Sequence, residues 1–226
     1  MKRLIIICAL ISSISFIVSC KKKKKDEITE DETPQPIANN FPDYNPHKAG
    51  NYWIYERFEI DEDGNSKSLH EFDSSYVEKD TVINNKTYTK IRRQDFLFKQ
   101  FNYLLQRDSL HYIIGPSGGV IFSSEDFTTV FNRFSNVDQS GDTIYKVSVK
   151  MADRDFEVSA PAGKFLTSAM KSTIFTFPAY ASPNVPNPRN MYTRFAKNIG
   201  VITETEVPFL GSPLLRERRL IRYHVN

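Results

Sequence analysis

The sequence predicts an all-β domain whose antiparallel strands follow one another as a meander. Residues 52–60, 145–151 and 156–160 support this prediction because β-branched, aromatic or strictly alternating apolar and polar residues dominate them. A period of two places successive side chains on opposite faces of a sheet, whereas a helix needs a period of 3.6. We expect about nine to eleven strands that form a curled half-barrel, a barrel or a sandwich.

Residues that tolerate a positive φ separate the predicted strands. Asp63-Gly64-Asn65 and Asn84-Asn85 are short enough for tight hairpin turns. The segments 115–119 and 138–142 combine glycine with proline, serine or aspartate and predict longer breaks. Turns of this kind between strand-like runs favour an antiparallel meander.

Little helix is expected. One short helix is predicted over residues 125–134, with Ser124 as its N-cap and acidic residues in its first turn. Residues 218–225 predict a final strand with Arg218 and Arg222 on one face and Arg219 on the other. We interpret it as a charged edge strand that resists pairing with other chains, the alternative being a contact with an anion or a lipid headgroup.

The first 20 residues have the layout of an export signal. Lys2 and Arg3 precede an apolar stretch over residues 4–18, which is too short to span a bilayer comfortably. The stretch ends in Ser19-Cys20, which resembles the bacterial lipobox. That resemblance implies cleavage before Cys20 and lipid attachment to its thiol. An ordinary secretory signal or an uncleaved anchor is the alternative.

The two cysteines of the chain agree with lipidation. Cys8 is removed with the predicted signal peptide 1–19, so that Cys20 is the one cysteine of the mature chain. A single thiol forms no internal disulfide. The two or three acyl chains that the lipobox resemblance implies would hold the protein on a membrane stably.

Residues 20–40 predict a disordered, charged tether. Five lysines, Lys21 to Lys25, are followed by an acidic run and then by prolines, with few apolar residues. Lys25, Asp26 and Glu27 resemble the signal that directs Bacteroidota-type lipoproteins to the cell surface. Two alternatives are a lysine block that contacts anionic headgroups and a solvated spacer.

Residues 41–226 predict a single globular domain with ample length for a core. From Thr33 onward the chain carries 23 Lys and Arg residues and 22 Asp and Glu residues. Because nucleic-acid binding needs a basic folded face, this balance disfavours a nucleic-acid partner.

A second resemblance covers most of this domain. Its motifs are Gly50-Asn51-Tyr52-Trp53 at the start, Pro161-Ala162-Gly163-Lys164-Phe165 in the middle and Ala196-Lys197-Asn198-Ile199-Gly200-Val201 late in the chain. Together they resemble a family of exported β-sheet lipoproteins of unknown function. The resemblance implies a fold and no chemistry.

The sequence contains no recognisable motif for catalysis, metal binding or a cofactor. No two of the four histidines, His47, His70, His111 and His224, stand at metal-ligand spacing. Neither a nucleophile elbow nor a phosphate-binding loop is present. We therefore predict neither catalytic residues, nor a metal site, nor a cofactor.

The first predicted strand offers a candidate ligand site. Trp53, Tyr55 and Arg57 share one of its faces, and Tyr52, Ile54 and Phe58 lie on the other. If the core takes the Tyr52 face, the indole of Trp53 is left for an apolar or amphipathic ligand. The opposite orientation buries Trp53 as a core residue. The loops 178–190 and 207–213 are further candidates for a lid or a partner contact.

These observations predict a membrane-anchored lipoprotein of the cell envelope, on the periplasmic or surface face of the outer membrane. We expect it to be a binding or accessory module for a ligand or an envelope protein. The alternative is an envelope enzyme whose active site is assembled from residues distant in sequence.

Overall fold

A computed structural model describes residues 41–94, 100–206 and 211–226. The predicted signal peptide, the tether, Cys20 and the Lys25-Asp26-Glu27 segment lie outside these residues. So do residues 207–210, which belong to one of the two candidate loops. No helix among the described residues is long and apolar enough to cross a membrane.

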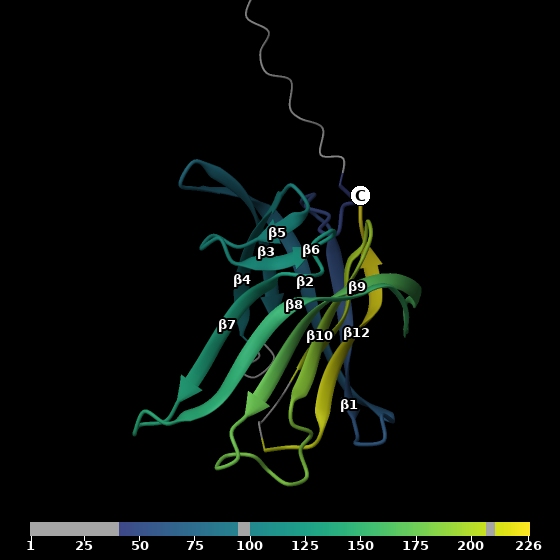
Figure 1. The fold of residues 1–226 in the computed structure, drawn as a ribbon. Helices are drawn as coiled ribbons and strands as arrows, with labels where there is room; N and C mark the ends of the chain where they lie inside the picture. Colours follow the sequence, from purple (N-terminus) through teal and green to yellow (C-terminus); the bar gives the residue numbers. More distant parts are fainter. Residues whose placement is uncertain (1–40, 95–99, 207–210) are drawn as a thin grey trace, which may run out of the picture. The chain divides into compact units, whose positions relative to one another are not determined.

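The described residues form an all-β fold of twelve antiparallel strands, which confirms the predicted class (Figure 1). The number of strands exceeds the nine to eleven expected. The short β5 and β6 flank the glycine-rich break at 115–119, and each has too few residues to show a period. The strands are β1 Tyr52–Ile60, β2 Ser66–Ile83, β3 Lys86–Gln94, β4 Phe101–Ser109, β5 Tyr112–Ile114, β6 Val120–Ser123, β7 Val130–Val137, β8 Thr143–Ala160, β9 Gly163–Thr176, β10 Arg189–Ala196, β11 Gly200–Glu206 and β12 Leu215–His224.

All twelve strands belong to one sheet in the order β6-β5-β4-β3-β2-β1-β12-β11-β10-β9-β8-β7. Strands β1 to β6 pair in sequence order, as do β7 to β12, and the two series join at the centre, where β1 pairs with β12. β6 and β7, although consecutive in the sequence, lie at opposite ends of the sheet order. The sheet curls into a nearly closed barrel, so that β6 at one end of the order lies against β9 near the other (Figure 1).

The predicted turns are present. Asn84 and Asn85 both have a positive φ, 49° and 58°, and connect β2 to β3 in a two-residue turn. Gly64, with φ 81°, lies in the turn between β1 and β2. Positive φ at consecutive positions matches the right-handed twist of the flanking strands, which is why asparagine and glycine stand here.

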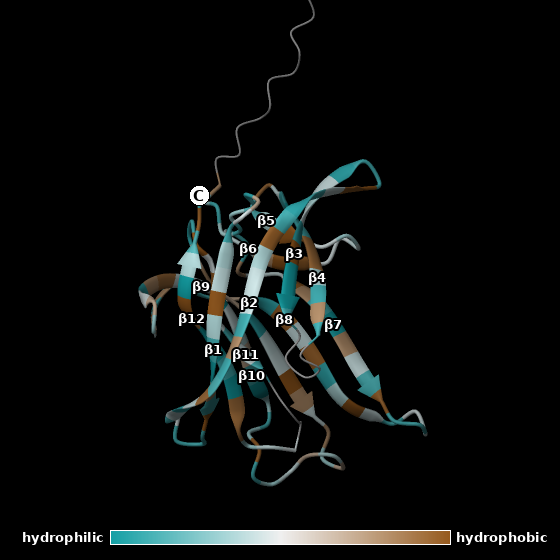
Figure 2. Cartoon of the chain, turned by 180° about the vertical axis from the view of Figure 1, so that it is seen from behind, coloured by the Kyte–Doolittle hydropathy of each residue, from teal (hydrophilic) through white to brown (hydrophobic). Residues whose placement is uncertain are grey.

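The core fills the inside of the curl, and hydropathy alternates along the strands that surround it (Figure 2). One cluster of buried residues lies around the central strands: Trp53, Tyr55, Val77, Ile91, Ala196, Ile202 and Leu220. A second cluster joins β5 and β6 to β8, β9 and β10: Ile113, Phe122, Met151, Met170 and Phe195. The second cluster therefore holds the two ends of the sheet order together.

The helix predicted at residues 125–134 does not form. Ser123 rather than Ser124 accepts hydrogen bonds from backbone amides, those of Glu125 and Asp126, at 3.2 and 2.8 Å. These bonds resemble a helix cap, but Val130 then begins strand β7. The β-branched residues in the segment favour this outcome, because they lose rotamer freedom in a helix.

The final strand is not an edge strand, contrary to the prediction. β12 pairs with β1 on one side and with β11 on the other. A bulge at Ile221, between Leu220 and Arg222, shifts the register against β1. The extra residue reverses the alternation, so that Arg218 is buried while Arg222 is exposed. The expectation that these two arginines share a face is therefore wrong.

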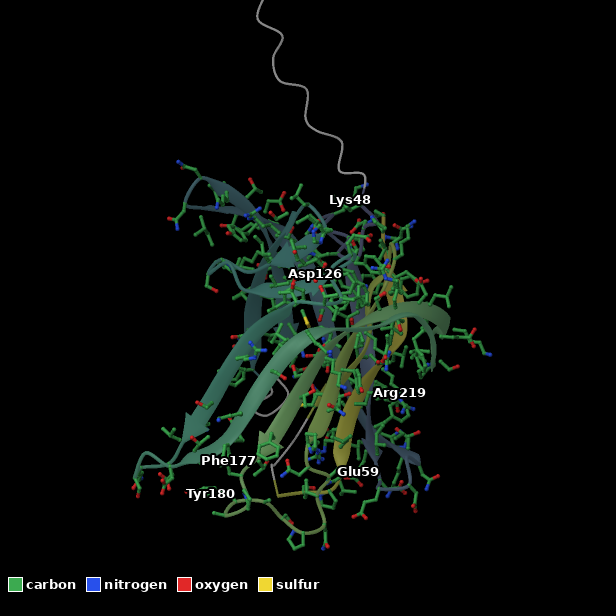
Figure 3. The ribbon with its side chains drawn as sticks, in the orientation of Figure 1. Lys48, Glu59, Asp126, Phe177, Tyr180 and Arg219 are labelled. Carbon is green, nitrogen blue, oxygen red and sulfur yellow. The ribbon has the colours of Figure 1, made fainter. Side chains whose placement is uncertain are left out.

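The proline-rich loop that connects β9 to β10 is present as predicted. Its Tyr180 donates a hydrogen bond to Asp138 at 2.6 Å, which ties the loop to the turn between β7 and β8. Phe177 and Tyr180 lie at the end of the sheet away from Lys48 (Figure 3). The loop is thus far from the end at which the described chain begins.

Candidate functional site

Strand β1 turns its Trp53 face into the curl. Trp53 is 5% exposed, Tyr55 2% and Arg57 4%, whereas Tyr52, Ile54 and Phe58 are half-buried. Of the two orientations considered from the sequence, the structure has the one that buries Trp53. Burial in this fold does not remove Trp53 and Tyr55 from a ligand, however, because both line an interior cavity.

Backbone contacts fix the indole of Trp53. Its Nε1 donates a hydrogen bond to the carbonyl oxygen of Ile199 at 2.6 Å. The next residue, Gly200, has φ +99°, a backbone conformation that residues with a side chain rarely adopt. A Cβ atom at this position would lie 3.6 Å from the indole ring. The Gly-x-Tyr-Trp and Ala-x-x-x-Gly motifs of the sequence therefore meet at this contact.

Tyr55, two residues after Trp53 on β1, is also held by a backbone carbonyl. Its hydroxyl donates to the carbonyl oxygen of Val201 at 3.0 Å, and the guanidinium of Arg218 lies 4.3 Å from the centre of its ring. Burial raises the pKa of Tyr55 above its usual value, so the phenol stays neutral. The ring therefore offers an apolar wall and no charge.

Behind this wall lies a network of buried ion pairs. Arg57 contacts Asp73 at 2.7 Å, and Arg218 contacts the other oxygen of Asp73 at 3.3 Å. Arg218 also contacts Glu204 through two nitrogens, at 2.6 and 2.8 Å. Arg93 contacts the same oxygen of Glu204 at 2.9 Å. Five side chains from five strands are thus linked through two carboxylates.

The network sets the ionisation of its glutamates in opposite directions. Burial by itself raises the pKa of Glu204, but Arg218 and Arg93 outweigh that effect and lower it to about 2. Burial raises the pKa of Glu206 above its usual value, with Arg57 at 3.3 Å only partly opposing the shift. One oxygen of Glu206 is buried without a hydrogen-bond partner. Of these two glutamates, Glu204 is therefore the one that stays ionised as the pH falls.

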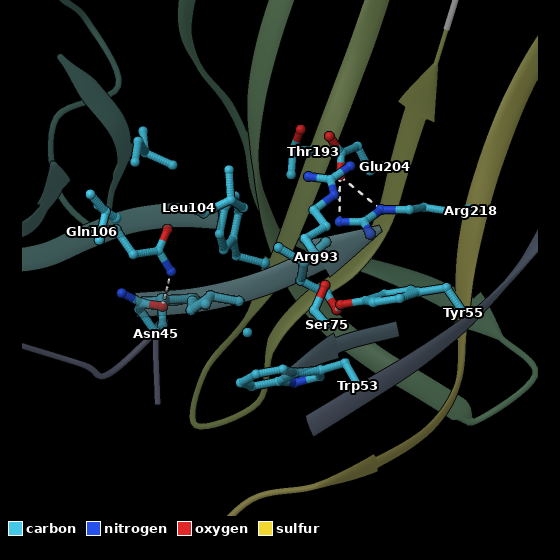
Figure 4. A pocket seen from close by; sticks show the side chains of 17 residues that line it. Asn45, Trp53, Tyr55, Ser75, Arg93, Leu104, Gln106, Thr193, Glu204 and Arg218 are labelled. Atoms are coloured by element: carbon cyan, nitrogen blue, oxygen red, sulfur yellow. Dashed lines mark hydrogen bonds and ion pairs between the residues drawn. The ribbon is translucent and has the colours of Figure 1, made fainter. Parts of the chain in front are cut away.

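The cavity between this network and the core has a volume of about 280 Å³ (Figure 4). Its apolar walls come from both halves of the sheet: Trp53, Tyr55, Ile91, Leu104, Ile121, Phe195 and Val201. Apolar cavities of about 150 Å³ hold one benzene ring. The space therefore suits a small ligand with a short alkyl chain or an aromatic ring.

A few polar groups meet at the walls of this cavity. Ser75, Thr193 and the ion-paired Arg93, Glu204 and Arg218 lie on one side (Figure 4). Gln106 and Asn45, which are hydrogen-bonded to each other, lie on another. The side chain of Arg93 is 22% exposed, and Glu204 is its one ion-pair partner among the described residues. Its remaining N–H groups can therefore donate hydrogen bonds to an acidic group of a ligand.

The three residues singled out from the sequence thus have two different places. Trp53 and Tyr55 line the cavity, whereas Arg57 lies in the ion-pair network and does not. Sequence reasoning missed Arg93 and Glu204. One feature of the sequence could have indicated them. Each is a charged residue in a strand-forming run, on the same face as an apolar residue two positions earlier: Ile91 for Arg93 and Ile202 for Glu204.

A second polar cluster includes His47, which lies outside the cavity. Its imidazole contacts Asp108 at 2.7 Å through Nε2 and Thr89 at 2.8 Å through Nδ1. Histidine between a carboxylate and a hydroxyl is the arrangement of some nucleophilic enzymes. Thr89, however, is 4% exposed and also hydrogen-bonds Asp80 at 3.4 Å, so the cluster ties the chain before β1 to β3 and β4. The described residues contain no group of three or more potential metal ligands.

No protein-family model matches the chain, and no curated protein matches it. Among solved structures, a Bacteroides fragilis protein provisionally described as exported, with a YmcC-like fold, is similar with a TM-score of 0.46 and 13% identity. The likeness covers 79% of this chain and 97% of that one. A provisionally described lipoprotein of Parabacteroides distasonis is similar with a TM-score of 0.40 and 14% identity, over 82% of this chain and 100% of that one.

Proposed function

We propose that this protein is a lipid-anchored binding module of the cell envelope, and that its interior cavity binds a small amphipathic acid. Cys20 would carry the lipid, at the end of an export signal. The tether 20–40 would link the lipid to the β-domain on the periplasmic or surface side of the outer membrane. The cavity supplies the binding function.

One observation carries the choice of ligand: Arg93 stands among the polar groups at one side of a cavity whose other walls are mainly apolar. Small-molecule sites generally combine apolar walls with a few placed polar groups. The indole of Trp53 and the ring of Tyr55 would contact the apolar part of the ligand. Arg93 would pair with its acidic group, since a guanidinium binds a carboxylate through parallel N–H bonds.

Fluorescence of Trp53, the only tryptophan of the chain, gives a direct test on the full-length protein in mild detergent below its critical micelle concentration. Titration with decanoate should change the emission saturably, and titration with decanol should do so at tenfold or more higher concentration. The Arg93→Gln variant should lose the preference for decanoate over decanol. Arg133→Gln, an exposed arginine on β7, is the control and should keep the preference.

Two outcomes would count against this function. Emission that neither compound changes, together with complete protection from aqueous quenchers, would show that Trp53 is a core residue without access to a ligand. An unchanged preference in Arg93→Gln would show that the guanidinium does not select the acid.

A further inference from the structure

Five residues form a straight row across five neighbouring strands. In the register of the sheet, Tyr103 on β4 is opposite Arg92 on β3, and Arg92 is opposite Tyr76 on β2. Tyr76 is opposite Tyr52 on β1, which is opposite His224 on β12. Directly opposed residues of antiparallel strands share a face of the sheet. We name these five residues the cross-strand row.

The cross-strand row lies on the outside of the curl. Tyr76 stands between the buried Ser75 and Val77, and Tyr52 is next to the buried Trp53. Tyr76 is 43% exposed and Tyr103 52%. The five strands lie side by side in the view from behind (Figure 2). Because adjacent strands are about 4.8 Å apart, the row is about 19 Å long.

Cations hold the aromatic rings on this face. The ammonium of Lys90 lies 3.6 Å from the centre of the Tyr103 ring, and the guanidinium of Arg92 lies 3.8 Å from that of Phe101. A cation against one face of a ring leaves the opposite face free for another contact. Phe101 is 48% exposed. The rings therefore form a platform rather than a part of the core.

At the other end of the row, two rings stack on each other beside an arginine that has no ion-pair partner among the described residues. The rings of Tyr52 and His224 lie 5.8 Å apart at an interplanar angle of 25°. Arg222, two positions before His224 on the same strand, makes no ion pair within the described part of the chain, and neither does Arg92. The cross-strand row itself contains no carboxylate. Glu78, which pairs with Lys90 at 3.1 Å, is the neighbouring acid.

We infer that the cross-strand row binds an extended acidic polysaccharide. Sugar rings present apolar faces that pack on exposed aromatic rings, and a linear row of such rings suits a linear chain of sugars. Arg92 and Arg222 would pair with carboxylates along the polymer. The site is separate from the cavity, because the row occupies the opposite face of the same strands.

Two other partners fit the row less well. Nucleic acid also stacks on aromatic rings, but it requires a strongly basic surface, and the chain from Thr33 onward has nearly balanced charge. A protein bound to a membrane surface buries apolar side chains at the boundary of the acyl chains, whereas the row consists of tyrosine, arginine and histidine. The charge and the shape of the row favour the acidic polysaccharide.

The test uses the full-length protein in mild detergent, with binding to immobilised polygalacturonate measured by an optical biosensor. Replacing both Tyr76 and Tyr103 by alanine should weaken binding at least tenfold. Arg92→Gln should weaken it about threefold or more and reduce its dependence on salt. The matched controls are Phe134→Ala and Phe175→Ala, which remove rings that are 49% and 43% exposed on β7 and β9; binding should change less than twofold.

Tyr76→Phe keeps the ring and should bind as the parent does, which separates loss of the platform from loss of the fold. Competition identifies the partner, and soluble polygalacturonate should compete better than dextran, an oligodeoxythymidylate or dioctanoyl phosphatidylglycerol. Three results would overturn the inference. The parent could fail to bind polygalacturonate. The double alanine variant and Arg92→Gln could bind as tightly as the parent, or one of the other three compounds could compete more strongly than polygalacturonate.

Discussion

The guanidinium of Arg218 lies 3.3 Å from the carboxylate of Asp73, although 145 positions separate the two residues in the sequence. Both side chains are almost completely buried, at 3% and 0% exposure. Burying charges is costly unless each has a partner. The pair joins the two halves of the sheet, and Arg57, Arg93 and Glu204 supply the neighbouring charges that offset its burial.

Replacing Arg218 by leucine should destabilise the protein by roughly 3–5 kcal/mol, because Asp73 and Glu204 would lose a buried partner. Urea unfolding at pH 7 measures the change. Arg222→Leu, on the same strand but exposed, should change the free energy of unfolding by less than about 0.5 kcal/mol. Equal stabilities of the two variants would show that the network does not contribute.

The depressed pKa of Glu204 should make the protein lose stability in acid. Its pKa falls from 4.5 to about 2 on folding, so its contribution is present above pH 4.5 and is lost as the pH falls toward 2. A shift of this size corresponds to about 3 kcal/mol. The free energy of unfolding of the parent should fall over that range, and that of Glu204→Gln should fall less steeply. Parallel pH profiles would contradict the prediction.

Gly200→Ala should destabilise the protein by roughly 1–2 kcal/mol, because φ +99° is strained for any residue with a side chain. The new methyl group would also contact the indole of Trp53 at 3.6 Å. Thermal unfolding and the emission maximum of Trp53 report both effects. Gly119→Ala, where φ is not positive and the nearest atom is 3.7 Å away, is the matched control and should change neither.

Replacing Cys20 by alanine should prevent lipid attachment to the protein. Without the thiol there is no site for the acyl chains, so the variant should either leave the membrane fraction or keep its signal peptide. Cell fractionation and the mass of the product distinguish these states. A variant that stays in the membrane fraction with its signal removed would show that the anchor is not a lipid on this residue.

Alanine at Lys25, Asp26 and Glu27 should reduce display on the cell surface if these residues direct it. The measurement is digestion of intact cells by an added protease, with total protein as the reference. The parent should be cut and the variant protected. Equal cleavage of both proteins, or of neither, would exclude a directing role for these residues.

Much of the fold follows from local patterns. Alternation in β1 and β8 and the asparagine turn at residues 84–85 each reflect the backbone of a few consecutive residues. Pairing is different, because no local pattern tells which distant strand lies beside β12. The final strand therefore resembled an edge in the sequence, although the structure places it at the centre of the sheet.

The candidate site was predictable only in part, for a related reason. Trp53 and Tyr55 stand out as aromatic residues in a strand, and alternation alone places them on one face. The acidic partners of Arg57, Arg93 and Arg218 come from other strands. A charged residue in a strand predicts exposure until its partner is known, so the buried network could not be read from hydrophobic patterning.

The pairing of β1 with β12 has a consequence for how the chain acquires its structure. The first and last strands share the middle of the sheet, so the central ladder cannot close until the carboxyl-terminal residues have been synthesised. Contacts between such distant segments are slow to form. The hairpins on either side can assemble early, but the walls of the cavity come from both. A chain that lacked only its last strand would therefore lose the pairing that joins the two half-sheets, and with it the cavity between them.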